Sequence, residues 1–322
     1  MPSRASARTS AGMRAYARAL LEQIPAVAPD VELVAVDAAW AAQPLALRRA
    51  GAQLVHLPYL DAPPLVPRPY TAMLHDLIHL RFPRLFARTT ALYWQFVAAP
   101  LYRGAARVLV SDPRVADDAV ALLGIERARI RVVPLGYEPL VTGARPWISP
   151  RPYVFYAGNH RPHKGLDTLY AAWRDLPGDV ELDLVLTGAD EPDVRRRYAR
   201  GHGEIVFIGD LDAETLARRY RGALAYVQPS LAEGFGIPAL EAAVAGTPVV
   251  ASTSAVPAPV APYAWTFAAG DAAALGSLID AIARDPERAR ERAAEGVETL
   301  RAYTWDRFAS ETAAVFREVV CS

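Results

Sequence analysis

The sequence has 322 residues, of which 52% are hydrophobic and 22% charged, and its formal net charge is zero. This length predicts about two domains, and the composition excludes an intrinsically disordered chain. The balanced charge gives no reason to expect a nucleic-acid partner, and the single cysteine, Cys321, excludes a disulfide framework and fits a reducing, cytoplasmic compartment.

Charge is distributed unevenly along the chain. Residues 1–138 contain 16 Arg, no Lys and 11 Asp or Glu. A mildly basic first half could face an anionic acceptor or a membrane surface, although chance scatter would explain it equally well. No apolar run approaches the roughly 20 residues of a membrane span, so the expected membrane contact is peripheral, through the N-terminal domain at the inner face of the membrane.

Alternating helices and strands are expected over residues 1–138, the predicted N-terminal domain. Met13, Tyr16, Leu20 and Ile24 recur at helical spacing. The elements expected in this domain are strands at 31–36, 54–57, 71–74, 108–111 and 130–133, and helices at 12–24, 85–101 and 114–123.

His75 and Asp76 follow the strand predicted at 71–74. Parallel sheets place their ligands at the carboxyl ends of strands, so both side chains are candidates for a binding site, although a histidine satisfied inside the sheet edge is the simpler interpretation. His75 and His79 also have the spacing of a zinc-protease helix. That interpretation fails because Asp76 replaces the required Glu and Pro83 interrupts the helix.

A linker is predicted at 139–152, which contains four prolines and a glycine. The C-terminal domain, 153–302, alternates strands and helices and therefore predicts a parallel sheet covered by helices on both faces. Its expected strands lie near 154–157, 182–187, 205–208, 224–228, 248–251 and 265–267, and its expected helices include 213–220, 271–284 and 286–300. A last helix is expected after this domain, at 305–320.

The loop after the first strand of this domain reads Gly158-Asn159-His160-Arg161-Pro162-His163-Lys164-Gly165. Lys164 is the only lysine beside 34 arginines, and Asn159 is the only asparagine. A single lysine in a glycine-bounded loop indicates a site for a compact ammonium, such as a phosphate contact, and the alternative is a solvated turn lysine.

Asp210 and Asp212 have the acid-x-acid spacing of a metal motif. Because a helical run follows Asp212, we predict a helix N-cap there and no bound metal.

Residues 233–241 read Glu-Gly-Phe-Gly-Ile-Pro-Ala-Leu-Glu. Pro238 suits the start of a helix, and the glycines before it let the backbone approach a ligand closely. A glycine loop that leads into a helix N-terminus is an anion cradle. Glu233 and Glu241 flank it and could accept hydrogen bonds from sugar hydroxyls, as a sugar nucleotide would require; otherwise they are ordinary surface acids.

The motif EGFGIPALEA resembles the donor site of retaining GT-B glycosyltransferases of the group 1 (GT4) family. The resemblance extends over nearly the whole chain. It implies an α/β protein with two Rossmann-like, doubly wound parallel-sheet domains facing across a cleft. It also implies that the last helix, within 303–322, crosses back onto the first domain.

The resemblance also assigns roles to matching residues. Glu233 holds the transferred sugar, Glu241 the ribose, and Arg161 and Lys164 the diphosphate, while His75 touches sugar and acceptor. The remaining donor-side residues are Gly158, Asn159, Gly234, Phe235, Gly236 and Ile237, and the acceptor side is represented by Gly12 and Asp76.

Three departures from the family pattern affect the acceptor side and the exit from the first domain. The residues before Ser10 do not predict the family's first strand, Arg14 stands where a loop glycine is expected beside Gly12, and Leu135 stands where asparagine is usual.

The expected activity is retaining transfer of a hexose from a nucleoside diphosphate sugar to a saccharide or lipid-linked acceptor, without a metal or cofactor. Mannose is suggested by the 158–165 loop and residues 75–83. Two alternatives remain: a non-catalytic sugar-nucleotide-binding relic or partner subunit, and a sugar-nucleotide 2-epimerase, against which the paired glutamates argue.

Overall fold

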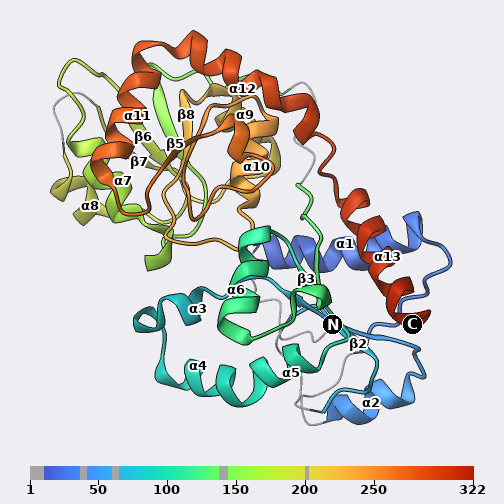
Figure 1. Ribbon diagram of the computed structural model, residues 1–322. Helices are drawn as coiled ribbons and strands as arrows, with labels where there is room; N and C mark the ends of the chain where they lie inside the picture. The colour runs from blue at the N-terminus through green and yellow to red at the C-terminus, as the bar shows by residue number, and fades with distance from the viewer. Residues whose placement is uncertain (1–10, 37–41, 60–64, 138–143, 200–202) are drawn as a thin grey trace. The chain divides into compact units, whose positions relative to one another are not determined.

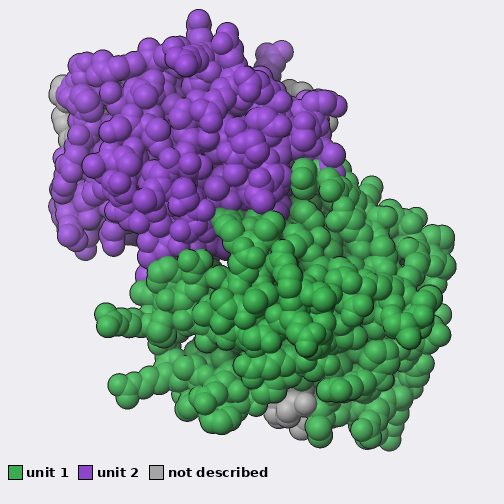
Figure 2. Space-filling view, viewed as in Figure 1, with its two compact units in different colours: residues 1–136, 303–322 green, residues 137–302 purple. Residues whose placement is uncertain are grey.

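The computed structural model describes residues 11–36, 42–59, 65–137, 144–199 and 203–322. The chain divides into two compact units, coloured separately in Figure 2. The first contains Met1–Gly136 with Tyr303–Ser322, and the second Tyr137–Ala302. These divisions lie close to the domain boundaries expected at 138, 153 and 303, and residues 138–143 of the expected linker lie outside the described residues.

The first unit contains a four-stranded parallel sheet in the order β1-β2-β3-β4. Its strands are β1 (Val55–Leu57), β2 (Tyr70–Leu74), β3 (Arg107–Val110) and β4 (Ile130–Val132). β2 is buried along its whole length, and Val108, Leu109 and Val110 of β3 are fully buried. A parallel sheet covered on both faces needs such continuous apolar runs.

Helices cover this sheet, as Figure 1 shows. They are α1 (Ala11–Val27), α2 (Gln43–Arg49), α3 (Ile78–Arg81), the 3-10 turn η3 (Pro83–Leu85), α4 (Arg88–Tyr93), the π-helical turn η4 (Trp94–Ala98), α5 (Ala99–Gly104), α6 (Pro113–Leu123), the 3-10 turn η5 (Arg127–Arg129) and α13 (Trp305–Val320). The last helix packs along the first, and the rings of Tyr16 and Phe308 meet with centroids 5.3 Å apart.

The strand expected at 31–36 is not formed, so this prediction is wrong. The segment alternates in sequence, but a strand also needs a hydrogen-bonded neighbour, and β1 pairs with β2 alone among the described strands. Residues 31–36 and 54–59 instead line a cavity of about 730 Å³. The predicted absence of a strand before Ser10 concerns residues outside the described ranges; within them, no strand precedes β1.

Two further expectations in this unit need correction. The first helix, expected at 12–24, runs from Ala11 to Val27. Gly12, which the resemblance matches to a glycine of the loop before that helix, therefore lies in its first turn. The helix expected at 85–101 begins at Arg88 instead and runs through a π-helical turn to Gly104. Pro83 opens the separate 3-10 turn, where its missing N–H leaves no hydrogen bond unmade.

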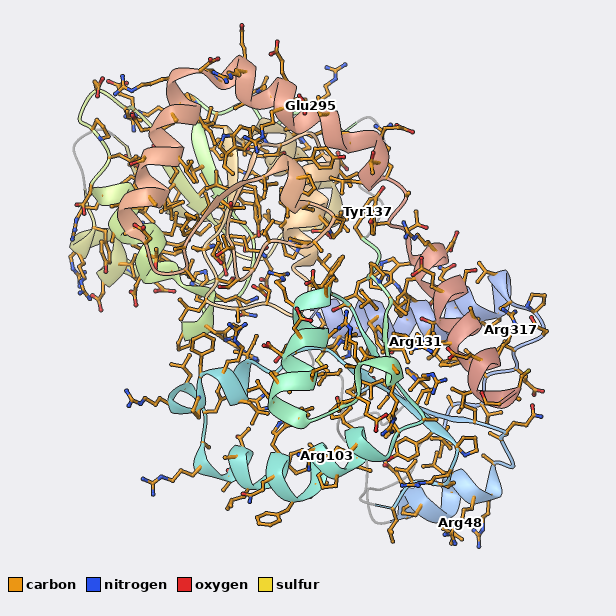
Figure 3. All side chains as sticks on the ribbon, viewed as in Figure 1. Arg48, Arg103, Arg131, Tyr137, Glu295 and Arg317 are labelled. Carbon is orange, nitrogen blue, oxygen red and sulfur yellow. The ribbon has the colours of Figure 1, made fainter. Side chains whose placement is uncertain are left out.

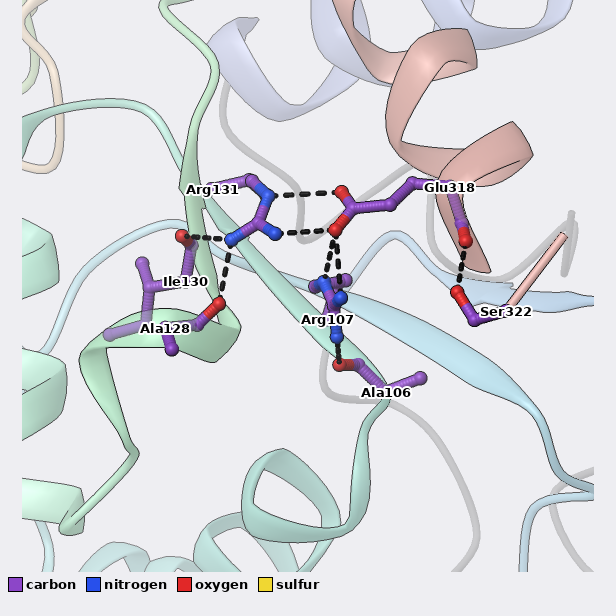
Figure 4. A network of polar contacts seen from close by, with 7 residues as sticks. All are labelled: Ala106, Arg107, Ala128, Ile130, Arg131, Glu318 and Ser322. Carbon is purple, nitrogen blue, oxygen red and sulfur yellow. Dashed lines mark hydrogen bonds and ion pairs between the residues drawn. The ribbon is translucent and has the colours of Figure 1, made fainter. Parts of the chain in front are cut away.

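Glu318 joins α13 to the sheet (Figure 4). Its carboxylate accepts hydrogen bonds from Arg107 Nε at 2.9 Å and Arg131 Nε at 3.0 Å. These arginines lie on β3 and β4, and their guanidinium groups hold the pKa of the Glu318 carboxyl at about 2, well below its usual range. The C-terminal helix is therefore part of the first unit through both apolar packing and charge.

The second unit contains a six-stranded parallel sheet in the order β10-β9-β8-β5-β6-β7. The strands are β5 (Tyr153–Tyr156), β6 (Asp183–Leu186), β7 (Ile205–Phe207), β8 (Ala225–Gln228), β9 (Val249–Ser252) and β10 (Trp265–Phe267). All six agree with the expected strands to within two residues. The strand order reverses between β5 and β8, which makes their carboxyl ends the topological switch point of the sheet.

Helices lie on both faces of this sheet. They are the 3-10 turn η6 (Pro162–Lys164), α7 (Leu166–Arg174), α8 (Pro192–Arg197), α9 (Ala213–Gly222), α10 (Ile237–Val244), the 3-10 turn η7 (Ala261–Tyr263), α11 (Ala272–Arg284) and α12 (Pro286–Leu300). Val154 and Tyr156 pack into the core shared with α7 and α11. Phe155, on the other face of β5, meets Tyr220 of α9. Alternate residues of one buried strand thus serve two helix layers.

Candidate functional site

The predicted donor residues gather at the switch point of the second sheet. Lys164 follows β5, and Glu233 follows β8, its parallel neighbour. Residues 69 positions apart in the sequence therefore come together because two adjacent parallel strands end at the same edge. Open parallel sheets bind their ligands at this position.

Lys164 and Glu233 form an ion pair, with 2.6 Å between Lys164 Nζ and Glu233 Oε1. The two side chains are only 18% and 12% exposed, whereas those of an exposed pair such as Arg196–Asp193 are 75% and 90% exposed. Ser230 Oγ donates to the same carboxylate oxygen at 2.7 Å. The pair is charge-balanced as it stands, and an ammonium has three N–H donors, so Lys164 can serve Glu233 and a ligand anion together.

The glycine loop before α10 has a conformation that excludes a side chain at Gly236. This residue is the helix N-cap and has φ of +96°, in the left-handed region. A Cβ there would lie 2.5 Å from Gln228 Nε2, which donates to the Ala255 carbonyl. Pro238 takes the second position of α10, one later than expected from the sequence. Backbone N–H groups of 234–237 are thereby held at a helix N-terminus.

Glu241 lies one turn inside α10 and is buried, with 8% of the residue exposed. Tyr220 donates its hydroxyl hydrogen to Glu241 Oε2 at 3.1 Å. Burial, together with the Glu241 charge, raises the pKa of Tyr220 well above its usual range, so the phenol stays a donor. Burial also raises the pKa values of Tyr156 and Tyr226, and the Glu233 charge adds to both effects.

The loop after β5 holds the other predicted donor residues. Gly158 N donates to Thr187 Oγ1 at 2.9 Å, and Asn159 Oδ1 accepts from Arg161 N at 3.3 Å. Arg161 is exposed. Gly165 has φ of +66°, and a Cβ there would lie 2.2 Å from the Pro229 carbonyl oxygen, so the loop packs closely against the end of β8.

Sequence reasoning missed several residues of this site. Ser230 lies just after β8, three residues before Glu233. Its position at the carboxyl end of a predicted strand could have identified it as a site residue. His160 lies between the Thr187 carbonyl oxygen, 2.7 Å from Nε2, and the Glu191 carboxylate, which contacts Nδ1. Neither the His160 contacts nor the Tyr220 contact had a sequence signal, because their partners lie 21 to 31 positions away.

His75 and Asp76 lie in the first unit, at the carboxyl end of β2. His75 Nε2 donates to the Pro58 carbonyl at 2.9 Å, and Tyr16 meets the imidazole edge to face. Burial lowers the pKa of His75, partly offset by the Pro58 hydrogen bond. A neutral ring that donates through Nε2 keeps Nδ1 as an acceptor. Asp76 accepts from Ile78 N at 3.1 Å at the start of α3.

His56 lies on β1 and is joined to Tyr16 and Thr71 in a part-buried chain of hydrogen bonds. Its Nε2 is 2.8 Å from the Tyr16 hydroxyl, and its Nδ1 is 2.9 Å from Thr71 Oγ1. Burial, with a smaller contribution from His75, lowers the pKa of His56 to about 3. The first unit thus holds two histidines with lowered pKa values, His56 within β1 and His75 after the carboxyl end of β2.

The acid pair 210/212 has a structural role. Asp212 accepts from Thr215 N at 2.7 Å as the N-cap of α9, which confirms that prediction. Within the described ranges, no cluster of three or more His, Cys, Asp or Glu side chains is arranged to hold a metal ion. The helices of the same ranges include none with the length and apolar character needed to span a bilayer.

Comparisons with known proteins connect this site to a family. The sequence model described as "Glycosyl transferases group 1" matches residues 144–298. The phosphatidyl-myo-inositol mannosyltransferase of Mycobacterium leprae (strain TN) is 34% identical over 179 residues, which are 52% of this chain and 47% of that protein. The MMP alpha-(1->4)-mannosyltransferase of Mycolicibacterium hassiacum is 30% identical over 220 residues, covering 64% of this chain and 52% of that protein.

The chain therefore spans about half the length of the curated relatives it matches. Among solved structures, sucrose-phosphate synthase from Thermosynechococcus elongatus superposes with a TM-score of 0.69 at 24% identity, over 88% of this chain and 78% of that one. Its likeness shows that the fold class is GT-B, as the sequence predicted. Residues 144–298, which make up most of the second unit and carry the Lys164–Glu233 pair, thus belong to the group 1 family of glycosyl transferases.

Proposed function

We propose that the chain transfers a hexose from a nucleoside diphosphate sugar to a saccharide or lipid-linked acceptor, with retention of the anomeric configuration. The observation that carries this proposal is the Lys164–Glu233 pair at the switch point, beside the glycine loop of α10. That arrangement offers cations, backbone donors and a carboxylate within one edge of a sheet. A sugar nucleotide presents the matching anions and hydroxyls.

The diphosphate would be bound by Lys164, Arg161 and the backbone N–H groups of 234–237. Negative charge grows on the departing diphosphate as the glycosidic bond breaks. These donors would therefore bind the transition state more strongly than the ground state, which is the requirement for catalysis. Fixed cations supply this stabilisation without a metal, so we propose a metal-independent reaction without a cofactor.

The hydroxyl groups of the donor would be bound by the two glutamates. Glu233, held by Lys164 and Ser230, would accept hydrogen bonds from the sugar, and Glu241 from the ribose. The Glu241 carboxylate already accepts a hydrogen bond from the Tyr220 hydroxyl, and it would accept further hydrogen bonds from the ribose hydroxyls. The neutral His75, whose Nδ1 is an acceptor, would contact the transferred sugar and the acceptor hydroxyl.

Mannose is the hexose that we propose, because two of the similar proteins are named as mannosyltransferases. One of these names also contains a phosphatidyl-inositol acceptor, which supports the lipid-linked class. Transfer would take place in the cytoplasm or at the inner face of the membrane.

The first experiment is a thermal-shift titration with UDP-, GDP- and ADP-sugars and with the free diphosphates, in the presence of EDTA. A ligand that binds only the folded state raises its stability. We expect a shift selective for one nucleotide, with GDP-mannose first, and its persistence in EDTA would support the metal-free site. The same sample, incubated with the selected donor and no acceptor, should release nucleoside diphosphate slowly.

Other outcomes would identify the alternatives. Binding without transfer or hydrolysis would indicate a non-catalytic subunit. Conversion of the donor into its 2-epimer would indicate an epimerase. If well-folded protein showed no shift with any nucleotide, the proposed donor site would be wrong.

A further inference from the structure

A long segment of the first unit contains arginines and no acidic residue. Residues 77–111 include Arg81, Arg84, Arg88, Arg103 and Arg107, and the nearest acids, Asp76 and Asp112, lie just outside. At the average density of 35 acids in 322 residues, about four would be expected in a segment of this length. The local charge is therefore strongly positive although the whole chain is neutral.

Residues 78–104 of this segment form α3, η3, α4, η4 and α5, and β3 follows them. From Arg88 to Gly104 the helical turns are continuous, and one side of them is buried through Trp94, Ala98 and Tyr102. The opposite side is apolar as well, because Leu92 is 55% and Phe96 68% exposed, with Leu85 41% exposed just before the helix. Apolar side chains on the outer side of a helix that already buries its inner side require an explanation.

Arg84 and Arg88 are exposed beside these apolar side chains. Among the described residues neither takes part in an ion pair, whereas Arg81 lies 3.5 Å from Asp118 and Arg107 pairs with Glu318. Figure 3 shows nitrogen-tipped side chains that extend outward from the α3 and α4 part of the ribbon. We define the α4 face as Arg84, Leu85, Arg88, Leu92 and Phe96.

We propose that the α4 face binds the surface of a membrane that contains anionic lipid. Its charge has one sign, which complements a headgroup layer of uniform negative charge. Leu85, Leu92 and Phe96 would enter the boundary between headgroups and acyl chains, as the apolar side of an interfacial helix does. The same chain segment begins directly after His75 and Asp76, which are acceptor-side residues under the proposed function, so membrane binding would present a lipid-linked acceptor to this unit.

The test is flotation of the full chain with vesicles of phosphatidylcholine alone and of phosphatidylcholine with about one third phosphatidylglycerol. We expect binding to the anionic vesicles only, weakening as salt is added. The double change Arg84→Glu and Arg88→Glu should lower the partition coefficient on the order of 10–100-fold. Leu92→Ser with Phe96→Ser should lower it about tenfold or more.

Matched controls separate this surface from general charge and apolarity. Arg48→Glu with Arg49→Glu makes the same charge change on α2 of the same unit, and Ile148→Ser removes a side chain that is 91% exposed in the second unit. Both should bind vesicles like the unchanged chain. All the replaced residues are exposed, so thermal unfolding should stay unchanged and loss of folding cannot imitate the expected result.

Three results would overturn the proposal: no binding to anionic vesicles, equal loss in the control variants, or binding that the α4-face variants leave intact. A change in oligomeric state of the α4-face variants without vesicle binding would assign the surface to a second copy of the chain instead. The thermal shift with nucleotide sugars should be the same in all variants, so this proposal and the donor site can fail independently.

Discussion

At the scale of single residues, the site depends on one ion pair whose members serve different parts of the proposed ligand. Lys164 and Glu233 neutralise each other in the absence of ligand, at 2.6 Å and with little exposure. Removing either member leaves the other charge partly buried without its partner, which costs more than losing a surface pair. Catalytic and structural effects must therefore be separated in any variant.

Lys164→Ala is expected to lower turnover on the order of 10²–10³-fold, the scale for losing one transition-state donor. Lys164→Arg should restore only part of it, because the planar guanidinium cannot replace a compact ammonium between a carboxylate and a phosphate. Steady-state transfer rates and thermal unfolding of both variants provide the measurement. Arg145→Ala, at an exposed residue of the same unit, is the control. Retention of more than half of the activity in Lys164→Ala would contradict the assigned role.

At the scale of elements, the start of α10 is the feature most sensitive to substitution. Gly236→Ala would require a left-handed conformation and would push Cβ against the amide of Gln228. Gly270 has φ of +87°, and a Cβ added there would meet no atom within 4 Å. An alanine at 270 would therefore have to adopt the same left-handed conformation but would make no steric clash. Comparing alanine substitutions at the two positions therefore separates the cost of backbone strain from the cost of the steric clash.

Gly270→Ala should reduce the free energy of unfolding by about 1–2 kcal/mol from strain alone. Gly236→Ala should cost about 1–3 kcal/mol more, since the buried Gln228 amide would lose its hydrogen bond to Ala255. Denaturant unfolding measures both, and nucleotide-sugar binding should be lost in Gly236→Ala only. Equal stabilities of the two variants would show that the glycine loop is looser than described.

The attachment of α13 gives a second prediction at this scale. Hydrogen bonds from Arg131 and Arg107 lower the folded-state pKa of Glu318 to about 2, so the unfolded chain binds the proton more readily. The stabilisation is therefore fully present above about pH 4.5 and is lost as the pH falls toward about 2. Glu318→Gln should remove about 1 kcal/mol near neutral pH, a value that allows for screening of the partly exposed carboxylate.

Unfolding curves of Glu318→Gln at neutral pH and at about pH 3 are the measurement. The difference from the unchanged chain should shrink in acid. Glu311→Gln, on the same helix in an i,i+4 pair with Arg307, is the control and should change stability by only about 0.3–0.5 kcal/mol. A difference that grows in acid would have the wrong sign for this pair.

At the scale of the whole molecule, the two units should respond differently to acid. The first unit contains three histidines whose burial lowers their pKa, to about 3 for His56 and about 4 for His79, with His75 lowered as well. Below about pH 6.5 the unfolded chain binds protons that these folded-state imidazoles do not, so the stability of the first unit falls as the pH drops.

Calorimetry between about pH 7.5 and about pH 5 should therefore show the transition of the first unit moving to lower temperature first. The Gly236→Ala variant identifies the transition of the second unit, because it should lower the unfolding temperature of that unit alone. His79→Phe should reduce the acid sensitivity without loss of stability at neutral pH. The His79 ring packs against Trp94 with ring centroids 4.0 Å apart and a tilt of 32°, and its buried Nε2 has no hydrogen-bond partner among the described residues. If the second unit's transition moved first, the buried histidines would not govern acid unfolding.

The sequence by itself determined the second unit almost completely. Its six strands, the N-cap at Asp212 and the glycine loop before α10 are encoded by local sequence patterns. Such patterns do not depend on which distant residues the chain packs against. Residue chemistry also indicated Lys164 and Glu233 as donor-site residues. Lys164 is the sole lysine of the chain, and Glu233 is an acid beside the glycine loop.

Tertiary structure decided the features that depend on partners distant in the sequence. Alternation at 31–36 could not form a strand without a neighbour, and no local signal joined Tyr220 to Glu241 or α13 to β3 and β4. The meeting of Lys164 with Glu233 likewise follows from β8 pairing beside β5. Strand order and hydrogen-bond partners are properties of the folded sheet, whereas caps, turns and periodicity are properties of the chain.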